Sequence, residues 1–332
     1  MALDVIVKID LVKAPGKVGM GIPLILAQNA EADVAFTEVT SLTEVTDAGY
    51  ANTSDTYKAA NLIFMQNDAP RSIAVCSTTG TAAEWLGDEG NVSKDWRQLI
   101  VVGGVADHAA IMPVIETLRG KMYFASLSVE DTATLKVDAM ERTVLFYCTD
   151  VDYAGVEVAA LVGASAGLDA GSFTYKNLIL KGIAAQQLSD GEINAIHEKG
   201  GITFVRKAGD NVTSEGKVAG GEYIDIIDTK DYIIQQLEYR TQKFLNVSAK
   251  VPYDNNGIGQ LELIAVSVLK EAANMGMIAE GEDGSPAYTV NYALRADTLD
   301  SDRAVRRYIG GNFSFNLAGA VHNVEITGQI IV

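Results

Sequence analysis

The sequence contains few of the residues on which metal and redox chemistry depend. Its 332 residues include only two cysteines, Cys76 and Cys148, and three histidines. Each cysteine lies in an apolar, strand-like run, so we expect buried free thiols of a reducing cytoplasm in preference to a disulfide. No Cys/His pair has metal-site spacing, and His197-Glu198 is not followed by the second histidine of a zinc protease helix. We therefore expect no metal and no other cofactor.

Long apolar runs and positive charge are also scarce. No stretch approaches the roughly 20 apolar residues of a membrane helix, and Asp4 interrupts the first apolar run, which is unlike a secretory signal. Lysine and arginine total 26 against 43 aspartates and glutamates, a net charge of −17. Such a surface repels phosphate backbones and anionic lipid, so we expect neither nucleic-acid binding nor membrane insertion.

Apolar residues are plentiful, and their spacing predicts a layered α/β fold. Hydrophobic residues make up 48% of the chain, enough for a folded core. Short β-rich runs alternate with helical patterns, which indicates a sheet with some parallel pairing. The expected strands are 72–77, 98–103, 122–127, 143–148 and 177–181. The expected helices are 106–119, 152–166 and 190–199, the last with a capping box formed by Ser189 and Glu192.

The final third has a different pattern. A polar, glycine-rich stretch at 206–222 predicts a loop or hairpin, and two helices with core-facing stripes are expected at 228–245 and 257–276. Strand-like alternation returns at 313–317. Both chain ends also alternate, and a strand at a chain end needs a partner because free ends fray. The alternating apolar residues are Val5, Val7, Ile9 and Leu11 at the N-terminus, and Val324, Ile326, Ile330 and Val332 at the C-terminus.

Three motifs could carry enzyme chemistry, and each has a simpler explanation. Residues 163–167 fit G-x-S-x-G around Ser165, but the preceding stretch is helical and the following one is a breaker, which favours a small-residue helix end over a nucleophile elbow. Gly103-Gly104 lacks the rest of a phosphate-binding pattern and predicts a tight turn. His108 lies in a polar turn, where solvent exposure is expected. We therefore expect no catalytic residues.

A basic cluster stands out in this acidic chain. On a helix, Arg303, Arg306 and Arg307 would share one face, next to Asp302. Two interpretations stay open: a solvated face with local ion pairs, or a docking patch for an acidic partner.

Three segments of the final third together resemble one known family. They are GEYIDIIDTKDYIIQQL (221–237), KVPYDNNGIGQLELIAVSVLKEAANMGMI (250–278) and DRAVRRYIGGNFSFNLAGAVHNVEITGQIIV (302–332). In this order and spacing they resemble the conserved C-terminal domain of tail sheath proteins from contractile phages, phage-tail-like bacteriocins and related contractile injection systems. Each segment alone is weakly diagnostic.

The resemblance implies a sheath-type fold in the α+β or α/β class. Mixed β-sheets flanked by helices would carry extended N- and C-terminal β-arms. The implied divisions are an N-terminal arm (1–20), a variable α/β region (21–205), a conserved C-terminal domain (206–318) and a C-terminal arm (319–332). The alternating residues of the two chain ends would be the arm strands. Hinges for these arms are expected at Pro15, Gly16, Gly19 and Gly319.

The resemblance also implies a structural role. The subunits would form hexameric rings stacked into a helical sheath, exchange arm strands, and contract to drive an inner tube through a target envelope. The other partners would be the tail tube protein, the baseplate and the tail terminator, with assembly in the bacterial host cytoplasm and residence in the particle tail. Arg303, Arg306 and Arg307 would dock on the tube. The alternatives are a capsid or surface-layer subunit, or an α/β hydrolase using Ser165.

Overall fold

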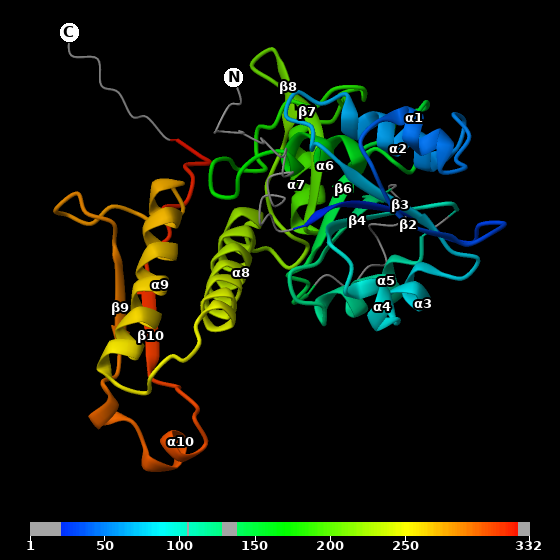
Figure 1. Cartoon of the computed structure of the whole chain (residues 1–332). Helices are drawn as coiled ribbons and strands as arrows, with labels where there is room; N and C mark the ends of the chain where they lie inside the picture. The colour runs from blue at the N-terminus through cyan, green and yellow to red at the C-terminus, as the bar shows by residue number, and fades with distance from the viewer. Residues whose placement is uncertain (1–20, 105, 128–137, 325–332) are drawn as a thin grey trace, which may run out of the picture.

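The computed structural model describes residues 21–104, 106–127 and 138–324. The first part of the described chain forms an eight-stranded mixed sheet in the order β2-β3-β1-β4-β5-β6-β7-β8 (Figure 1). The six central strands run parallel, and the two edge strands are antiparallel to their neighbours. Strands β4 and β6 are buried at every residue, because their continuous apolar runs are covered on both faces. The strands are β1 (Ile22–Ala27), β2 (Val34–Val39), β3 (Ile73–Ser77), β4 (Trp96–Val102), β5 (Met122–Leu127), β6 (Thr143–Tyr147), β7 (Gly201–Lys207) and β8 (Asp210–Thr213).

Helices cover both faces of this sheet, and together they form what we call the sheet body (residues 21–213). Ile25 of β1 faces the layer that contains α1, α2 and α6, whereas Leu24 and Leu26 face the layer that contains α3 and α5. This alternation follows from the two-residue period of a strand. The helices are α1 (Leu42–Asp47), α2 (Asp55–Phe64), α3 (Ala82–Leu86), α4 (Glu89–Val92), α5 (His108–Glu116), α6 (Val158–Ala166) and α7 (Asp190–Glu198).

Most of the predicted elements are confirmed. Four predicted strands correspond to β3 to β6, and the capping box of Ser189 and Glu192 is present at the start of α7. The predicted strand at 177–181 is wrong. Asn177 has a φ of 66°, which no strand residue adopts, and Leu178 makes its backbone hydrogen bonds with Thr213 alone. Thr213 of β8 bonds one end of this segment and the Gln66 side chain bonds the other, at Lys181, so no ladder forms.

The G-x-S-x-G motif brings α6 close to α2. A Cβ added at Gly163 would lie 2.6 Å from the Cα of Ile63, and one added at Gly167 would overlap the backbone carbonyl of Asp68. Ser165 is buried and its Oγ donates to the carbonyl of Leu161 at 2.9 Å, inside the helix. The motif is therefore a small-residue helix end, as the sequence predicted; it also permits close packing of the helix, and Ser165 is not an exposed nucleophile.

After β8 the chain forms a smaller C-terminal layer (residues 224–318), which extends away from the sheet body (Figure 1). Both long helices predicted from the sequence are present, and Ile233 of α8 packs with Val268, Leu269 and Ala272 of α9. Strands β9 and β10 form a separate two-stranded sheet beside α9. The elements are α8 (Ile224–Val247), α9 (Asn255–Asn274), β9 (Tyr288–Tyr292), the 3-10 helix η2 (Arg295–Asp297), α10 (Asp300–Ala304) and β10 (Gly311–Phe315).

The expectation of mixed β-sheets flanked by helices is confirmed. The four domain ranges remain predictions. Most of the predicted arm and hinge residues lie outside the described part of the chain, namely Val5, Val7, Ile9, Leu11, Pro15, Gly16, Gly19, Ile326, Ile330 and Val332.

Candidate functional site

In the two-stranded sheet of β9 and β10, the structure defines which residue pairs are hydrogen-bonded and which are not. The strands pair antiparallel with a constant register. Just beyond one end of the ladder, Ala293 N donates to Gly310 O at 3.0 Å, and beyond the other, Asn316 N donates to Ala287 O at 2.9 Å. Hydrogen-bonded and non-hydrogen-bonded pairs alternate along an antiparallel ladder. The even-numbered residues of β10 therefore point their backbone groups at β9, and the odd-numbered ones point away.

Both outer edges of this small sheet carry backbone groups that no other described strand pairs with. An isolated two-stranded sheet is only marginally stable in water, and an open edge is a template for another strand. The sheet therefore has room for one further strand on each side. The residues whose backbone N–H and C=O groups point away from the partner strand are Gly311, Phe313 and Phe315 on β10, and Tyr288, Val290 and Tyr292 on β9.

The two faces of this sheet differ in polarity. Tyr288, Val290 and Phe315 pack against the α9 core, whereas Thr289 and Ser314 on the opposite face join their hydroxyl groups at 2.7 Å. A strand that alternates apolar and polar residues would match both faces at once. The chain ends of this sequence have that alternation.

Exposed apolar side chains are concentrated in the C-terminal layer and in the segment that follows it. Twelve of the fourteen large ones among the described residues lie between positions 239 and 324. Surface clusters of this kind mark interaction sites in soluble proteins. The twelve are Tyr239, Leu245, Val247, Leu263, Leu294, Leu299, Val305, Ile309, Phe313, Leu317, Val321 and Val324.

The loop between β9 and β10, residues 293–310, forms a tip at the end of the C-terminal layer farthest from the sheet body (Figure 1). It is tied to the α8–α9 connection, because Arg295 Nε donates to Tyr253 O at 3.0 Å and Tyr253 OH donates to Arg307 O at 3.1 Å. The rings of Tyr253 and Tyr308 also meet edge to face. The tip loop is therefore a braced structure that holds its exposed side chains in place.

The tip loop separates the three predicted docking arginines. Helix α10 ends at Ala304 and Arg306 has a φ of 57°, so the single helical face expected for them does not form. Arg303 is half-buried, pairs with Asp300, and donates to the carbonyl oxygens of Arg295 and Thr298. It braces the loop, which fits the local ion-pair interpretation.

Arg306 and Arg307 are exposed and contact no carboxylate among the described residues. Their guanidinium groups are available to an acidic partner. The docking interpretation is therefore open for these two residues, whereas Arg303 already has its partners within the subunit.

The described C-terminal segment leaves β10 and returns to the sheet body (Figure 1). The predicted hinge residue Gly319 is exposed and has a φ of 60°, a conformation that glycine adopts freely. Val324, the first predicted residue of the C-terminal arm strand, is 75% exposed and lies outside any strand. Its partner, if it pairs as predicted, is not within the described subunit.

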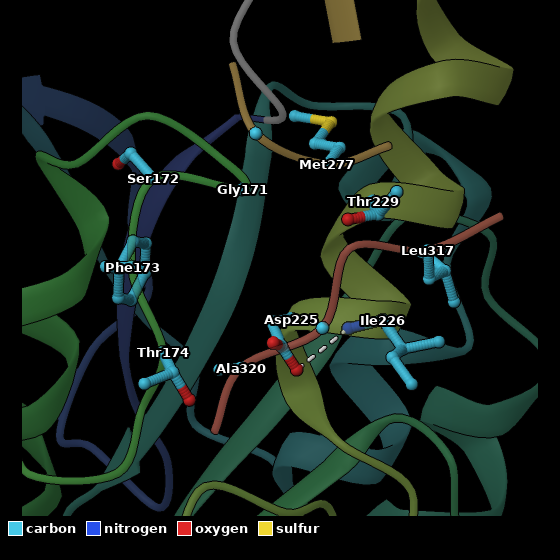
Figure 2. Close-up of a pocket in the computed structure, with 12 residues that line it drawn as sticks. Gly171, Ser172, Phe173, Thr174, Asp225, Ile226, Thr229, Met277, Leu317 and Ala320 are labelled. Atoms are coloured by element: carbon cyan, nitrogen blue, oxygen red, sulfur yellow. Dashed lines mark hydrogen bonds between the residues drawn. The ribbon is translucent and has the colours of Figure 1, made fainter. Parts of the chain in front are cut away.

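A cavity of about 280 Å³ lies under this segment, between the sheet body and α8. Figure 2 shows Phe173 and Thr174 on one side, Asp225 and Thr229 on the other, and Leu317 with the following residues across the opening. Burial raises the pKa of Asp225, and its Oδ1 accepts a hydrogen bond from the N–H of the next residue, at 3.1 Å. Asp225 is the one acidic or basic residue among the described residues that line the cavity.

A buried charge cluster fixes α8 to the sheet body. Arg97 of β4 donates to Asp228 at 2.5 Å and to Asp231 at 2.8 Å, both on α8. Arg142 makes a two-pronged contact with Asp231 at 2.7 and 2.9 Å. Burial alone would raise the pKa of Asp231, but the hydrogen bonds from Arg142 and the charge of Arg97 hold it below its usual value. Such forked contacts are geometrically specific and define the orientation of α8.

The remaining sequence candidates have structural roles. An added Cβ at Gly103 would lie 2.6 Å from Gln28 O, so this glycine permits a tight turn between β4 and α5. His108 is buried, which corrects the expected exposure, and its Nδ1 lies 2.8 Å from Tyr123 OH because α5 packs over β5. Within the described ranges, no group of three or more His, Cys, Asp or Glu is placed to hold a metal, and no helix could span a membrane.

No protein-family model and no curated protein matches the sequence. Solved structures do match. The helical sheath of the anti-feeding prophage in its contracted state matches with a TM-score of 0.74 and 13% identity, covering 94% of this chain and 93% of that one. The sheath of the extracellular contractile injection system PVC, also contracted, matches with a TM-score of 0.74 and 11% identity, covering 94% and 92%. This chain has the sheath-protein fold.

A sheath tail protein from Listeria innocua has the same sheath fold, with a TM-score of 0.60, 12% identity, and coverage of 91% of this chain and 93% of that one. Near-complete coverage of both chains means that the sheet body and the C-terminal layer both belong to the sheath fold. The resemblance seen in the sequence is therefore confirmed at the level of fold, and it extends over the region that carried no diagnostic motif.

Proposed function

We propose that this chain is the structural subunit of a contractile sheath, which polymerises around an inner tube by β-strand exchange of its terminal arms. The observation that carries the proposal is the β9–β10 sheet, whose outer edges are both unpaired within the described subunit. Strand addition to such an edge forms main-chain hydrogen bonds, and the alternating side chains select the register. The two alternating chain ends of neighbouring subunits are the proposed strands, one for each edge.

Electron microscopy of the purified full-length chain tests the polymerisation. We expect hollow tubes or stacked rings, and we expect them to disappear when residues 1–13 or, separately, 325–332 are deleted. Flat lattices or closed shells would favour the surface-layer or capsid alternative. A monomer at every concentration would contradict the proposal.

A substitution within β10 tests strand addition more sharply. The N–H of Phe313 points away from β9, so Phe313→Pro removes an outward donor without removing a bond of the β9–β10 ladder. Phe313→Ala is the matched control, because it removes the same ring but keeps the N–H. We expect Phe313→Pro to prevent polymerisation and Phe313→Ala to permit it, with unchanged circular dichroism of both monomers. Equal polymerisation by the two variants would argue against an incoming strand at this edge.

Docking of the inner tube is proposed for the tip loop, through Arg306 and Arg307. The loop brings exposed guanidinium groups and exposed aliphatic side chains together on a strongly acidic chain. Single exposed ion pairs contribute only ~0–1 kcal/mol each. Repeated along a tube, contacts of this strength would hold an extended sheath and still release when it contracts.

Reversal of these charges tests the docking. We expect an Arg306→Glu/Arg307→Glu variant to polymerise alone but to lose co-sedimentation with the tube protein of the same particle. Lys58→Glu/Lys199→Glu, in the sheet body and far along the chain from the tip loop, is the control for the same change in net charge. Retained co-sedimentation of the double variant would place the tube contact elsewhere.

The proposal includes the finer assembly. Hexameric rings would stack into a helical sheath between a baseplate and a tail terminator, assembled in the bacterial host cytoplasm and retained in the particle tail. Contraction would be a switch between two packings of rigid subunits that stay linked through their arms. No hydrolysis step is required, and the proposed role is structural rather than enzymatic.

A further inference from the structure

His322 differs from every neighbour in the segment that follows β10. From position 316 to position 324 it is the only residue that is not exposed. Its side chain is 8% exposed, whereas Val321 before it is 83% exposed and Val324 after it is 75% exposed. A segment that is otherwise solvated therefore inserts one ring into the rest of the subunit.

The ring is held by three neighbours from separate parts of the chain. Its Nε2 lies 2.9 Å from Thr174 Oγ1, and its Nδ1 lies 3.5 Å from Glu215 Oε1. Its edge meets the ring of Tyr223 with centroids 4.8 Å apart and an interplanar angle of 84°. Thr174 lies on the loop between α6 and α7, Glu215 lies on the segment between β8 and α8, and Tyr223 is the residue directly before α8. An edge-to-face ring pair with a hydrogen bond fixes both the position and the tilt of an imidazole.

The adjacent residue adds a contact to the same loop. Asn323 Oδ1 accepts a hydrogen bond from Lys176 Nζ at 3.4 Å, and the same lysine nitrogen lies 3.9 Å from Glu215. The anchor is therefore a pair of consecutive residues, attached to the sheet body at Thr174 and Lys176 and to the segment that joins β8 to α8 at Glu215 and Tyr223.

The segment is also attached at its other end, to the C-terminal layer. Ala318 N donates to Met277 O at 3.0 Å, directly after α9. Between these two attachments lie only Gly319, Ala320 and Val321, all exposed, with the cavity of Figure 2 beneath Ala320. Gly319 at a φ of 60° and an empty space below it allow this short strap to change shape at little cost.

We propose that His322 is the positioning residue that anchors the root of the C-terminal arm to the sheet body. The arm then leaves the subunit in a direction set by the sheet body and not by the β9–β10 sheet. Gly319, which precedes His322 in the chain, accommodates changes in the angle between the sheet body and the C-terminal layer. This role rests on the proposed sheath function, in which the residues beyond 324 reach a neighbouring subunit.

A fluorescent label beyond the anchor tests the proposal on the full-length monomer. The two native cysteines are buried, so Val324→Cys provides a single reactive thiol for a maleimide dye. We expect high anisotropy from this label, and a loss toward the value of a free peptide in the His322→Ala background. His322→Gln can still hydrogen bond to Thr174, so we expect it to restore part of the anisotropy.

A second label position provides the matched control. Val151 is 95% exposed on the sheet body, and we expect a label on Val151→Cys to be insensitive to His322→Ala. Unchanged anisotropy at position 324 would overturn the proposal. A fall at both positions would overturn it as well, because general loosening of the subunit would then explain the result.

Assembly is measured separately, so that the two proposals can fail independently. With the fold intact by circular dichroism, we expect His322→Ala to give fewer and less regular tubes than the unsubstituted chain. If the unsubstituted chain forms no tubes, the sheath function is wrong, while the anisotropy result still decides whether His322 anchors the segment.

Discussion

Replacement of Arg97 by methionine should destabilise the subunit more than any surface change of the same type. Arg97 is 3% exposed in its side chain and joins β4 to Asp228 and Asp231 of α8. Methionine keeps the length of the aliphatic stem but removes the charge. Asp231 would still be held by Arg142, whereas Asp228 would keep only the hydroxyl of Tyr175, at 3.2 Å. The buried carboxylate of Asp228 would thus lose its cation.

Removal of one partner from a buried ion pair typically costs ~3–5 kcal/mol, because the other charge stays desolvated. We expect a loss of this size in the free energy of unfolding, measured by urea titration with tryptophan fluorescence. Arg119→Met is the control: Arg119 also pairs with a carboxylate of α8, Glu238, at 2.9 Å, but the two side chains are 73% and 63% exposed. An exposed pair contributes ~0–1 kcal/mol.

A second substitution identifies the cause of the loss. Asp228→Leu alone should destabilise, because Arg97 then keeps one carboxylate partner instead of two. In the Arg97→Met background the same substitution should stabilise, because it removes the orphaned charge. Equal midpoints for Arg97→Met and Arg119→Met, or additive effects in the double variant, would refute this account of the junction.

Three further predictions follow from the packing of the sheet body and of α9. Gly163→Ala should destabilise the fold by about 1–3 kcal/mol, because the added Cβ meets the backbone of α2. Gly259→Ala on α9, where an added Cβ has nothing within 4 Å, should stabilise it by up to ~1 kcal/mol. Urea midpoints of the two variants that shift in the same direction would contradict this. Burial raises the thiol pKa of Cys76 and of Cys148 to about 12. Ellman's reagent should therefore label neither thiol in the native protein and both in denaturant. Rapid labelling of the native protein would be inconsistent with the structure. Burial lowers the pKa of Lys121 to about 8, so this lysine binds fewer protons in the folded state than in the unfolded state between that pH and about 10.4. The stability of the unsubstituted protein relative to Lys121→Met should therefore rise with pH across this window, because the two proteins share the opposite contribution of the buried thiols. Parallel pH profiles of the two proteins would rule the explanation out.

Several features of the fold could be predicted from local sequence because their causes are local. The strands β3 to β6 are continuous apolar runs, and α7 begins with its own capping box. The long helices α8 and α9 carry apolar stripes with helical spacing. The tail sheath resemblance depended on three segments of the C-terminal third, and the solved sheath structures extend it over nearly the whole chain.

The candidate site was only partly visible in the sequence. Strand β9 was missed, although the alternation of YTVNY at 288–292 is a usable signal. The arginine cluster was found, but its division into the bracing Arg303 and the free Arg306 and Arg307 depends on where α10 ends. Neither the ion cluster around Arg97 nor the anchoring role of His322 had any local signature.

Tertiary structure decided those features because each joins residues that are distant in the chain. Arg97 meets Asp228 across 131 positions, and His322 meets Thr174 across 148. The segment 177–181 has strand-like composition, yet its backbone bonds to Thr213 and to the Gln66 side chain, and it forms no ladder. Hydrophobic periodicity determined which segments become strands and helices, because it reflects one element and its own faces. Partner choice, burial of charge and the direction of the C-terminal segment depend on neighbours that only the folded chain brings together.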